Sequence, residues 1–346
     1  MRLKTLLLAA AALAVATGGA MARDLTVVSW GGAYQDAQKK VYFAPFTAET
    51  KIPLVDEPWD GGVGTLRAKV QSGKADWDVV QVESDELAVG CEEGLYEKLD
   101  WTKIGGKDAY IPDAVHECGV GAIFYDFVLG YDKDKLKDGP TGWADFFDLK
   151  KFPGKRALRN GPKTTLEIAL MGDGVAPKDV YKVLATPEGV DRAFKKLDTI
   201  KSDLIFWKSG AQPPQLLASG EVALTSVYNG RVDAANRNDH RNFGMVWNGA
   251  LYTMDSWVIL KGSPNLDAAY KFLAFVGRPE IEAKLPDAIA YGVPNVKANA
   301  LINPDRLKVL GTAPENIANA VLLNTAFWLE NSDRLTERFN QWAAQK

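Results

Sequence analysis

The chain has 346 residues, and at roughly 100–200 residues per domain this length predicts two domains. Hydrophobic residues make up 47% and charged residues 25%, which is typical of a globular protein and excludes a disordered chain or a polytopic membrane protein. The 41 Lys and Arg are balanced by 44 Asp and Glu without a long basic block, so nucleic acid is not an expected partner. With two histidines in all, a multi-histidine metal site is excluded, and we expect no metal.

The segment 1–22 has the pattern of a secretory signal peptide. Two cations near its start precede an apolar run at 6–15, which is too short to cross a bilayer because a helix needs about 20 residues for that. Ala20, Met21 and Ala22 then form the A-x-A pattern of a cleavage site. We therefore expect a secreted protein that is cleaved after Ala22; an uncleaved anchor is the less favoured alternative.

Secretion also determines how the two cysteines are interpreted. Cys91 and Cys118 are the whole cysteine content, and an even number of cysteines in an oxidising compartment favours a disulfide. Closing the loop between them would contribute about 3 kcal/mol in the chain-entropy model. Two buried thiols are the alternative, whereas a redox motif is disfavoured because the spacing is not C-x-x-C.

Short β-type runs alternate with helical patterns along the chain, which is typical of an α/β fold. Together with the length, the alternation predicts two α/β lobes without a long linker. In chain order the predicted elements are a strand at 25–30, a helix at 33–50, strands at 52–55 and 76–82 around a helix at 64–72, a helix from Ser84, strands at 123–131 and 155–159, helices at 164–172, 189–201 and 212–219, strands at 222–226, 243–247 and 254–260, a helix at 266–276, and a mostly helical tail at 314–345.

A secreted chain of this organisation is either a hinged solute receptor or a hydrolase. The sequence contains no G-x-S-x-G elbow, no H-E-x-x-H, no phosphate loop and no G-x-G-x-x-G. Glycosidase chemistry needs two carboxylates across a cleft, which a sequence neither shows nor excludes. A receptor without catalytic residues or cofactors is therefore the leading hypothesis, and a secreted α/β hydrolase is the alternative from a different class.

The motif S-W-G-G-A-Y at 29–34 follows the first mature strand. It resembles the periplasmic solute-binding proteins of ABC importers, above all their spermidine/putrescine-binding branch (extracellular solute-binding protein family 1). Further pieces of the resemblance are 76–80, 217–224 and 254–257. None is specific alone, but together they extend through most of the chain.

The resemblance implies a type II periplasmic binding protein fold, in which two lobes are joined by crossing hinge strands and the ligand lies in the cleft between them. Lobe 1 would comprise 23–130 and 254–300, and lobe 2 would comprise 131–253 and 301–346. Such a protein is expected to work in the periplasm as a monomer, to close around its ligand and to deliver it to the membrane subunits of an ABC permease. A role as the partner of a chemoreceptor, in addition to transport, is a weaker alternative.

The ligand site of this family is an aromatic box with carboxylates, a combination that suits amines because rings and carboxylates replace the water around a cation. Trp30 and Tyr34 match the aromatic residues after the first strand, and Asp255 matches the family's amine-binding Asp. Glu167 and Glu83 are further acidic candidates, although a helix-capping role explains Glu167 equally well. Additional candidates, each weighed against a place in the core, are Tyr125, Trp207 and Tyr228.

One position departs from the polyamine-binding pattern. Polyamine binders carry an acidic residue just after the turn that begins at Tyr228, and here that residue is Arg231. A guanidinium repels an amine but binds a carboxylate in bidentate fashion. Arg231 and Asp255 together favour an ω-amino acid such as γ-aminobutyrate over a polyamine such as putrescine or spermidine. The alternative is that Arg231 points to solvent or pairs with Asp233 or Glu167.

Overall fold

The computed structural model describes residues 23–73 and 76–345. The expected signal peptide at 1–22 and its cleavage site after Ala22 lie outside these ranges. Across the two ranges, no helix combines the length and the apolar character that a membrane crossing requires.

A single mixed sheet of nine strands forms the frame of the described chain. Its order is β2-β1-β3-β8-β4-β7-β5-β6, and β9 pairs with β8 outside this path. The strands are β1 Leu25–Ser29, β2 Leu54–Pro58, β3 Val79–Val82, β4 Gly119–Asp132, β5 Arg156–Arg159, β6 Leu204–Trp207, β7 Leu224–Tyr228, β8 Phe243–Ile259 and β9 Val321–Leu322.

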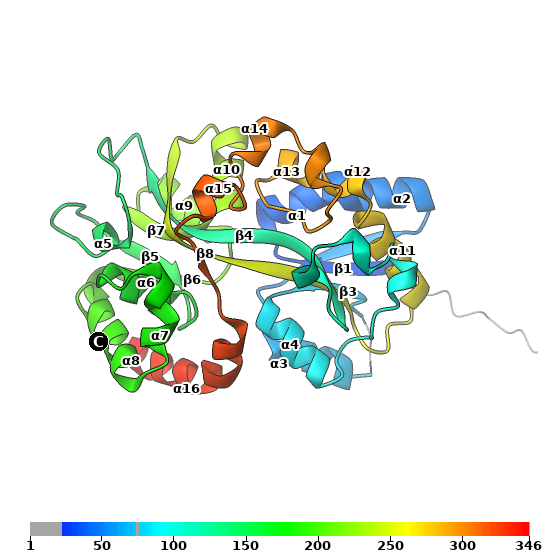
Figure 1. Ribbon diagram of the computed structural model, residues 1–346, viewed down its shortest axis with the longest axis horizontal. Helices are drawn as coiled ribbons and strands as arrows, with labels where there is room; N and C mark the ends of the chain where they lie inside the picture. Colours follow the sequence, from blue (N-terminus) through cyan, green and yellow to red (C-terminus); the bar gives the residue numbers. More distant parts are fainter. Residues whose placement is uncertain (1–22, 74–75, 346) are drawn as a thin grey trace, which may run out of the picture.

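Helices surround both ends of this sheet. In Figure 1, α1, α2, α3, α4 and α11 lie around β1 and β3, whereas α5 to α9 and α16 lie around β5 to β7. The helices are α1 Gly32–Gln38, α2 Ala44–Thr50, α3 Val63–Gln71, α4 Ser84–Glu92, α5 Trp143–Phe146, α6 Thr165–Gly172, α7 Val180–Leu184, α8 Pro187–Asp198, α9 Gln212–Ser219, α10 Asn229–Asn238, α11 Leu266–Val276, α12 Pro279–Glu282, α13 Leu285–Ala288, α14 Pro304–Leu307, α15 Pro314–Ile317 and α16 Thr325–Ala344. The predicted α/β fold is confirmed.

Two long strands join the two ends of the sheet. β4 has 14 residues and β8 has 17, and they pair antiparallel along most of their length. At one end β8 pairs with β3, and at the other end β4 pairs with β7. Figure 1 shows β4 and β8 running side by side between the two groups of helices. We call these groups the β1–β3 half and the β5–β7 half.

The β strands end where the two halves meet. β1 and β3 run parallel to each other in one half, and β5, β6 and β7 run parallel in the other. In open α/β sheets, ligands bind beyond the carboxyl ends of the strands. Trp30 and Glu83 directly follow β1 and β3, and Arg159 and Tyr228 end β5 and β7. This topology therefore directs side chains from both halves toward one central region.

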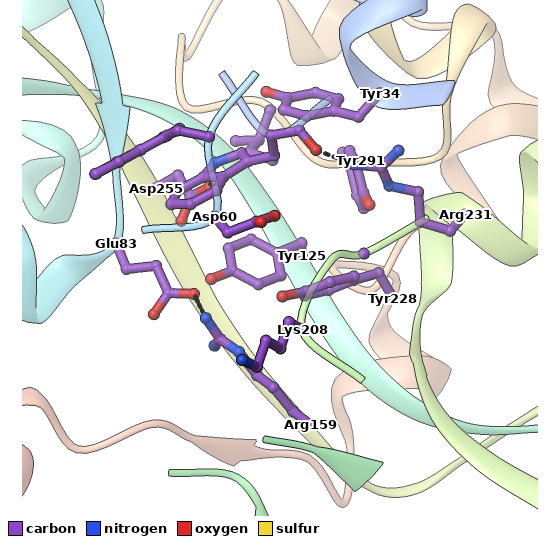
Figure 2. Close-up of a pocket in the computed structure, with 14 residues that line it drawn as sticks. Tyr34, Asp60, Glu83, Tyr125, Arg159, Lys208, Tyr228, Arg231, Asp255 and Tyr291 are labelled. Atoms are coloured by element: carbon purple, nitrogen blue, oxygen red, sulfur yellow. Dashed lines mark hydrogen bonds and ion pairs between the residues drawn. The ribbon is translucent and has the colours of Figure 1, made fainter. Parts of the chain in front are cut away.

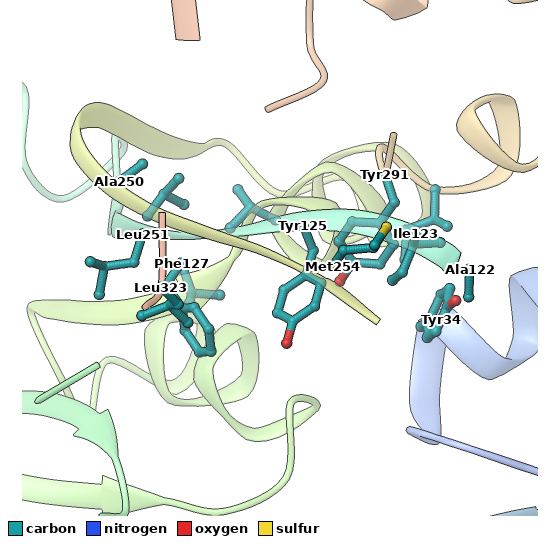
Figure 3. Close-up of a cluster of buried hydrophobic side chains, with 14 of the residues drawn as sticks. Tyr34, Ala122, Ile123, Tyr125, Phe127, Ala250, Leu251, Met254, Tyr291 and Leu323 are labelled. Atoms are coloured by element: carbon teal, nitrogen blue, oxygen red, sulfur yellow. The ribbon is translucent and has the colours of Figure 1, made fainter. Parts of the chain in front are cut away.

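The core continues through the strands that join the halves. Because side chains alternate along a strand, Ile123, Tyr125 and Phe127 of β4 share one face. Figure 3 shows this row together with Leu251 and Met254 of β8. Ile123, Tyr125 and Phe127 are at most 4% exposed. The central strands are thus packed on the side that faces the cleft.

Most predicted elements exist, and the strands and the tail differ from the prediction at three places. The predicted strands at 243–247 and 254–260 are one strand, β8, because the residues between them still pair with β4. The short strand β6 at Leu204–Trp207 was not predicted. The tail is not continuously helical, since Val321–Leu322 forms β9 against β8 before α16 begins.

The predicted disulfide is confirmed. Cys91 of α4 is bonded to Cys118, which directly precedes β4, and the two Cα atoms are 5.7 Å apart. The bond ties the helix that follows β3 to one of the two joining strands.

Candidate ligand-binding site

A cavity of about 40 Å³ lies where the strand ends of the two halves meet (Figure 2). Since about 10–15 Å³ of such space admits one water molecule, the cavity suits a small solute. Seven of the nine predicted ligand residues line it: Trp30, Tyr34, Glu83, Tyr125, Tyr228, Arg231 and Asp255.

The other two predicted residues lie outside the cavity. Glu167 is fully buried in α6, where its Oε1 accepts hydrogen bonds from Tyr181 Oη and Trp328 Nε1, each at 2.8 Å. It therefore joins α6 to α7 and α16. Trp207 is 1% exposed and packs behind the cavity wall, with its ring centroid 5.5 Å from that of Tyr228. Burial against neighbouring helices and rings explains both positions.

Several lining residues were not predicted. Arg159 and Lys208 lie at or just after the ends of β5 and β6, a position that would have identified them had β6 been recognised. Tyr291 comes from an irregular segment after α13, which carries no periodic signal. The full set of additional lining residues is Trp59, Asp60, Ile123, Arg159, Lys208, Gly210 and Tyr291.

Asp255 is the most deeply buried carboxylate of the cavity. It is 2% exposed, and its Oδ2 accepts hydrogen bonds from Trp30 Nε1 at 2.6 Å and from Gln81 Nε2 at 3.3 Å. Its Oδ1 has no hydrogen-bond partner within the described ranges. Burial and the negative charge of Glu83 raise the pKa of the Asp255 carboxyl well above its usual range. A cation in the cavity would stabilise the ionised form.

Aromatic rings form much of the wall around Asp255. Trp30 stacks on Trp59 with ring centroids 5.1 Å apart and an interplanar angle of 20°. Tyr125 meets the edges of Tyr228 at 5.5 Å and Tyr291 at 6.3 Å. Such rings attract a cation by about 0.5–2 kcal/mol each, so the chemistry of the Asp255 end of the cavity suits a positively charged group.

Arg231 lies near the start of α10 and is 4% exposed. Its Nη2 donates to the Trp30 carbonyl at 3.1 Å, and the guanidinium also interacts with the Tyr291 hydroxyl. Nε and Nη1 have no well-formed hydrogen bond in the part of the chain that the structure describes. A Cβ on Gly32 would lie 2.8 Å from Arg231 Nη1, so a larger residue there would displace the guanidinium. Since a buried donor without a partner is costly, a ligand anion would satisfy these N–H groups.

The alternatives considered for Arg231 do not occur. Asp233 forms ion pairs with Arg237 at 2.7 Å and with Arg306 at 2.8 Å. Glu167 is hydrogen-bonded elsewhere, as described above. Arg231 itself makes no ion pair with a carboxylate of the described residues and points into the cavity beside Tyr34 and Tyr291 (Figure 2).

Glu83 lines the cavity but already has two cationic partners. Its Oε1 is 2.7 Å from Arg159 Nη2, and its Oε2 accepts from Lys163 Nζ. Burial alone would raise the pKa of the Glu83 carboxyl, but Arg159 and Lys163 outweigh burial and lower the pKa from 4.5 to about 2. The negative charge of Glu83 is therefore balanced by ion pairs that join the two halves.

A cavity between the two halves of a shared sheet, lined by buried polar atoms from both halves, is typical of two-lobed solute-binding proteins. Residues 41–308 match the sequence family described as bacterial extracellular solute-binding proteins. The chain belongs to this family of extracellular and periplasmic binding proteins, which are not enzymes.

Known proteins resemble the chain over nearly its whole length. The gamma-aminobutyric acid-binding protein of Pseudomonas aeruginosa is 43% identical over 330 residues, which cover 95% of this chain and 94% of that protein. The crystal structure of MotA from A. tumefaciens B6 in complex with glucopine superposes with a TM-score of 0.86 at 33% identity, covering 93% of this chain and all of that one (100%). The structure of the Atu4243-GABA receptor gives 0.80 at 37% identity, covering 94% of this chain and 98% of that one.

Proposed function

We propose that this protein captures an ω-amino acid, with γ-aminobutyrate as the prototype, and delivers it to the membrane subunits of an ABC permease. The observation that carries the proposal is the pair of incomplete groups in one cavity. Asp255 has an unpaired carboxylate oxygen, and Arg231 has two unpaired guanidinium nitrogens. A zwitterion with separated charges would complete both groups.

The two charged groups are supported differently, which favours one orientation of the ligand. Asp255 is surrounded by rings and by the Trp30 indole N–H, which suits an ammonium group. Arg231 lies across the cavity on α10, where its planar donors suit a carboxylate. The ligand amine would therefore contact Asp255 and the ligand carboxylate would contact Arg231.

A polyamine is the less favoured ligand. Both of its ends are cationic, so one end would meet the buried guanidinium of Arg231, and like charges at close range are a strong means of exclusion. The relative from Pseudomonas aeruginosa named for γ-aminobutyric acid supports the same choice.

Capture would proceed by closure of two lobes. The proposed lobes are 23–130 with 254–300 and 131–253 with 301–346, and β4 and β8 are the strands that pass between them. The protein would work in the periplasm as a monomer after cleavage at Ala22.

The test is a calorimetric titration of the mature protein with γ-aminobutyrate, putrescine and spermidine, repeated with Arg231→Gln. Wild type is expected to bind γ-aminobutyrate most tightly, and Arg231→Gln is expected to weaken that binding about a hundredfold, because a charge-assisted bidentate contact is lost. Arg237→Gln is the matched control. Arg237 is also on α10, and its partner Asp233 retains Arg306. Tighter binding of a polyamine than of γ-aminobutyrate by wild type would contradict the proposal.

A further inference from the structure

The binding cavity is the first of three hollows that follow one another along the gap between the halves. The second is small, about 10 Å³, and shares Glu83 with the cavity. The third is a groove of about 730 Å³. It shares Ser84, Thr253, Leu323 and Thr325 with the second.

Four charged side chains stand between the cavity and the groove. Glu83 and Asp85 come from the junction of β3 and α4, and Arg159 and Lys163 come from the end of β5 and the loop after it. Arg159 pairs with Glu83 at 2.7 Å, and Lys163 pairs with Asp85 at 2.8 Å and also with Glu83. We call these four residues the ion-pair barrier; Figure 2 shows its Glu83–Arg159 contact below the rings.

Strand β8 lies next to the ion-pair barrier. β3 pairs with β8 as far as Ser256, and β9 pairs with it at Leu251 and Tyr252. At Met254, between the stretches of β8 that pair with β3 and with β9, Ser84 Oγ donates a hydrogen bond to the Met254 carbonyl at 2.8 Å. The same stretch of β8 carries Asp255 toward the cavity and Met254 toward the groove.

The groove beyond the barrier is mostly apolar. Leu87, Phe124, Tyr252, Met254 and Leu322 all line it. A methylene chain can pack on such a surface, whereas both carboxylates of the barrier are already paired with cations. The ion-pair barrier therefore lies between the cavity and the small second hollow, whereas the β4–β8 pair itself separates the cavity from the Phe124 and Met254 side of the groove.

We propose that the ion-pair barrier sets the maximum length of the solute, so that the protein selects short ω-amino acids and rejects longer ones. The inference rests on the proposed function. A ligand whose carboxylate is held by Arg231 and whose chain is longer than the distance to Asp255 would carry its ammonium group toward Glu83. There it would meet Arg159 and Lys163, which repel it and which occupy the acidic groups.

The test is a chain-length series with 4-aminobutyrate, 6-aminohexanoate and 8-aminooctanoate, measured by calorimetry. Wild type is expected to prefer the four-carbon acid over the eight-carbon acid by at least tenfold. Arg159→Ala with Lys163→Ala removes the cations and leaves Glu83 and Asp85 to receive the ammonium of a longer ligand. This double variant is expected to reduce the preference at least tenfold.

The matched control removes the same two charges elsewhere in the β5–β7 half. Arg192 and Lys196 both face Asp173 on an exposed surface, at 2.6 and 3.8 Å. Arg192→Ala with Lys196→Ala is expected to keep the wild-type preference. An equal change in this control would show that net charge, and not the barrier, sets the preference.

Two outcomes overturn the inference. In the first, wild type binds all three acids equally; in the second, the double variant binds 4-aminobutyrate but retains the wild-type preference. If the double variant does not fold, Lys163→Met, which keeps the Glu83–Arg159 pair, must reduce the preference at least threefold. If wild type binds only polyamines, the proposed function fails while the barrier is still tested, with diamines of four, five and eight carbons in place of the acids.

Discussion

Two buried aspartates on the joining strands differ in what surrounds them. Asp255 of β8 and Asp126 of β4 are each 2% exposed, and each has an Oδ1 without a hydrogen-bond partner among the residues described. They lie on opposite faces of the strand pair, since Asp126 falls between Tyr125 and Phe127. Only Asp255 lines the cavity.

The surroundings of Asp126 leave no space for a ligand. Its Oδ2 would lie 1.5 Å from a Cβ on Gly311, so the carboxyl group packs directly on that glycine. Burial alone raises the pKa of the Asp126 carboxyl to about 7. Asp255, by contrast, lines the cavity and accepts hydrogen bonds from the Trp30 indole N–H and the Gln81 amide. An unpaired buried carboxylate therefore marks a binding site only where a cavity and oriented donors accompany it.

The largest expected effect is on ligand affinity, which should depend on Asp255 and hardly at all on Asp126. Asp255→Asn removes the charge that would hold the ligand ammonium, and we expect γ-aminobutyrate binding to weaken about a thousandfold, or about 4 kcal/mol. Asp126→Asn should change the affinity less than threefold. Isothermal titration calorimetry on both variants measures the difference. Equal losses would mean that the two residues act only through the fold.

A second prediction separates them by stability. Because the pKa of Asp126 is raised to about 7 in the folded protein, its contribution to stability is complete below about pH 4 and is lost as the pH rises to about 7. The Asp126→Asn variant does not lose stability in this way, because asparagine does not ionise. The variant should therefore gain stability relative to wild type as the pH rises across that range, by at most roughly 3–4 kcal/mol.

Urea denaturation at pH 4.5, 6 and 8 tests this prediction. All other buried acids titrate equally in the two proteins, so the difference isolates Asp126. A constant difference at the three pH values would show that Asp126 stays ionised in the folded protein.

Glu83 sharpens the comparison because its pH dependence has the opposite sign. Its pKa is lowered from 4.5 to about 2 by Arg159 and Lys163, so its contribution is present above about pH 4.5 and is lost as the pH falls toward 2. Glu83→Gln should be less stable than wild type at pH 6 by roughly 2–3 kcal/mol. The difference in stability between wild type and Glu83→Gln should be smaller at pH 3, as measured by urea denaturation. If the difference in stability increased as the pH fell, the ion pairs of Glu83 would not be its cause.

The positions at strand ends were predictable from the sequence, and the pairings across the cleft were not. The resemblance to solute-binding proteins indicates Trp30 and Asp255, and their places after a strand and within an apolar strand are consistent with it. Glu83 was recognised as a cavity residue, but its partners lie in the other half of the sheet, and only the folded chain brings them together. Glu167 lies outside the cavity, because an acidic residue at the start of a helix packs equally well between helices.

The same limit applies to residues outside regular elements. Tyr291 forms one wall of the cavity from an irregular segment, and neither a helical nor a strand period marks it. The missed strand β6 had only four residues, too short a run to show a period. Local pattern thus predicted the framework of the site, and tertiary contacts determined which charges remained free.

The most direct test of the central claim is a crystal structure of the mature protein with γ-aminobutyrate. The ligand amine is expected at about 3 Å from Asp255 Oδ1, and the ligand carboxylate at about the same distance from Arg231 Nε and Nη1. Arg159 also lines the cavity and has an Nη1 without a partner in the described chain. A carboxylate bound to Arg159, with Arg231 left unpaired, would contradict the account.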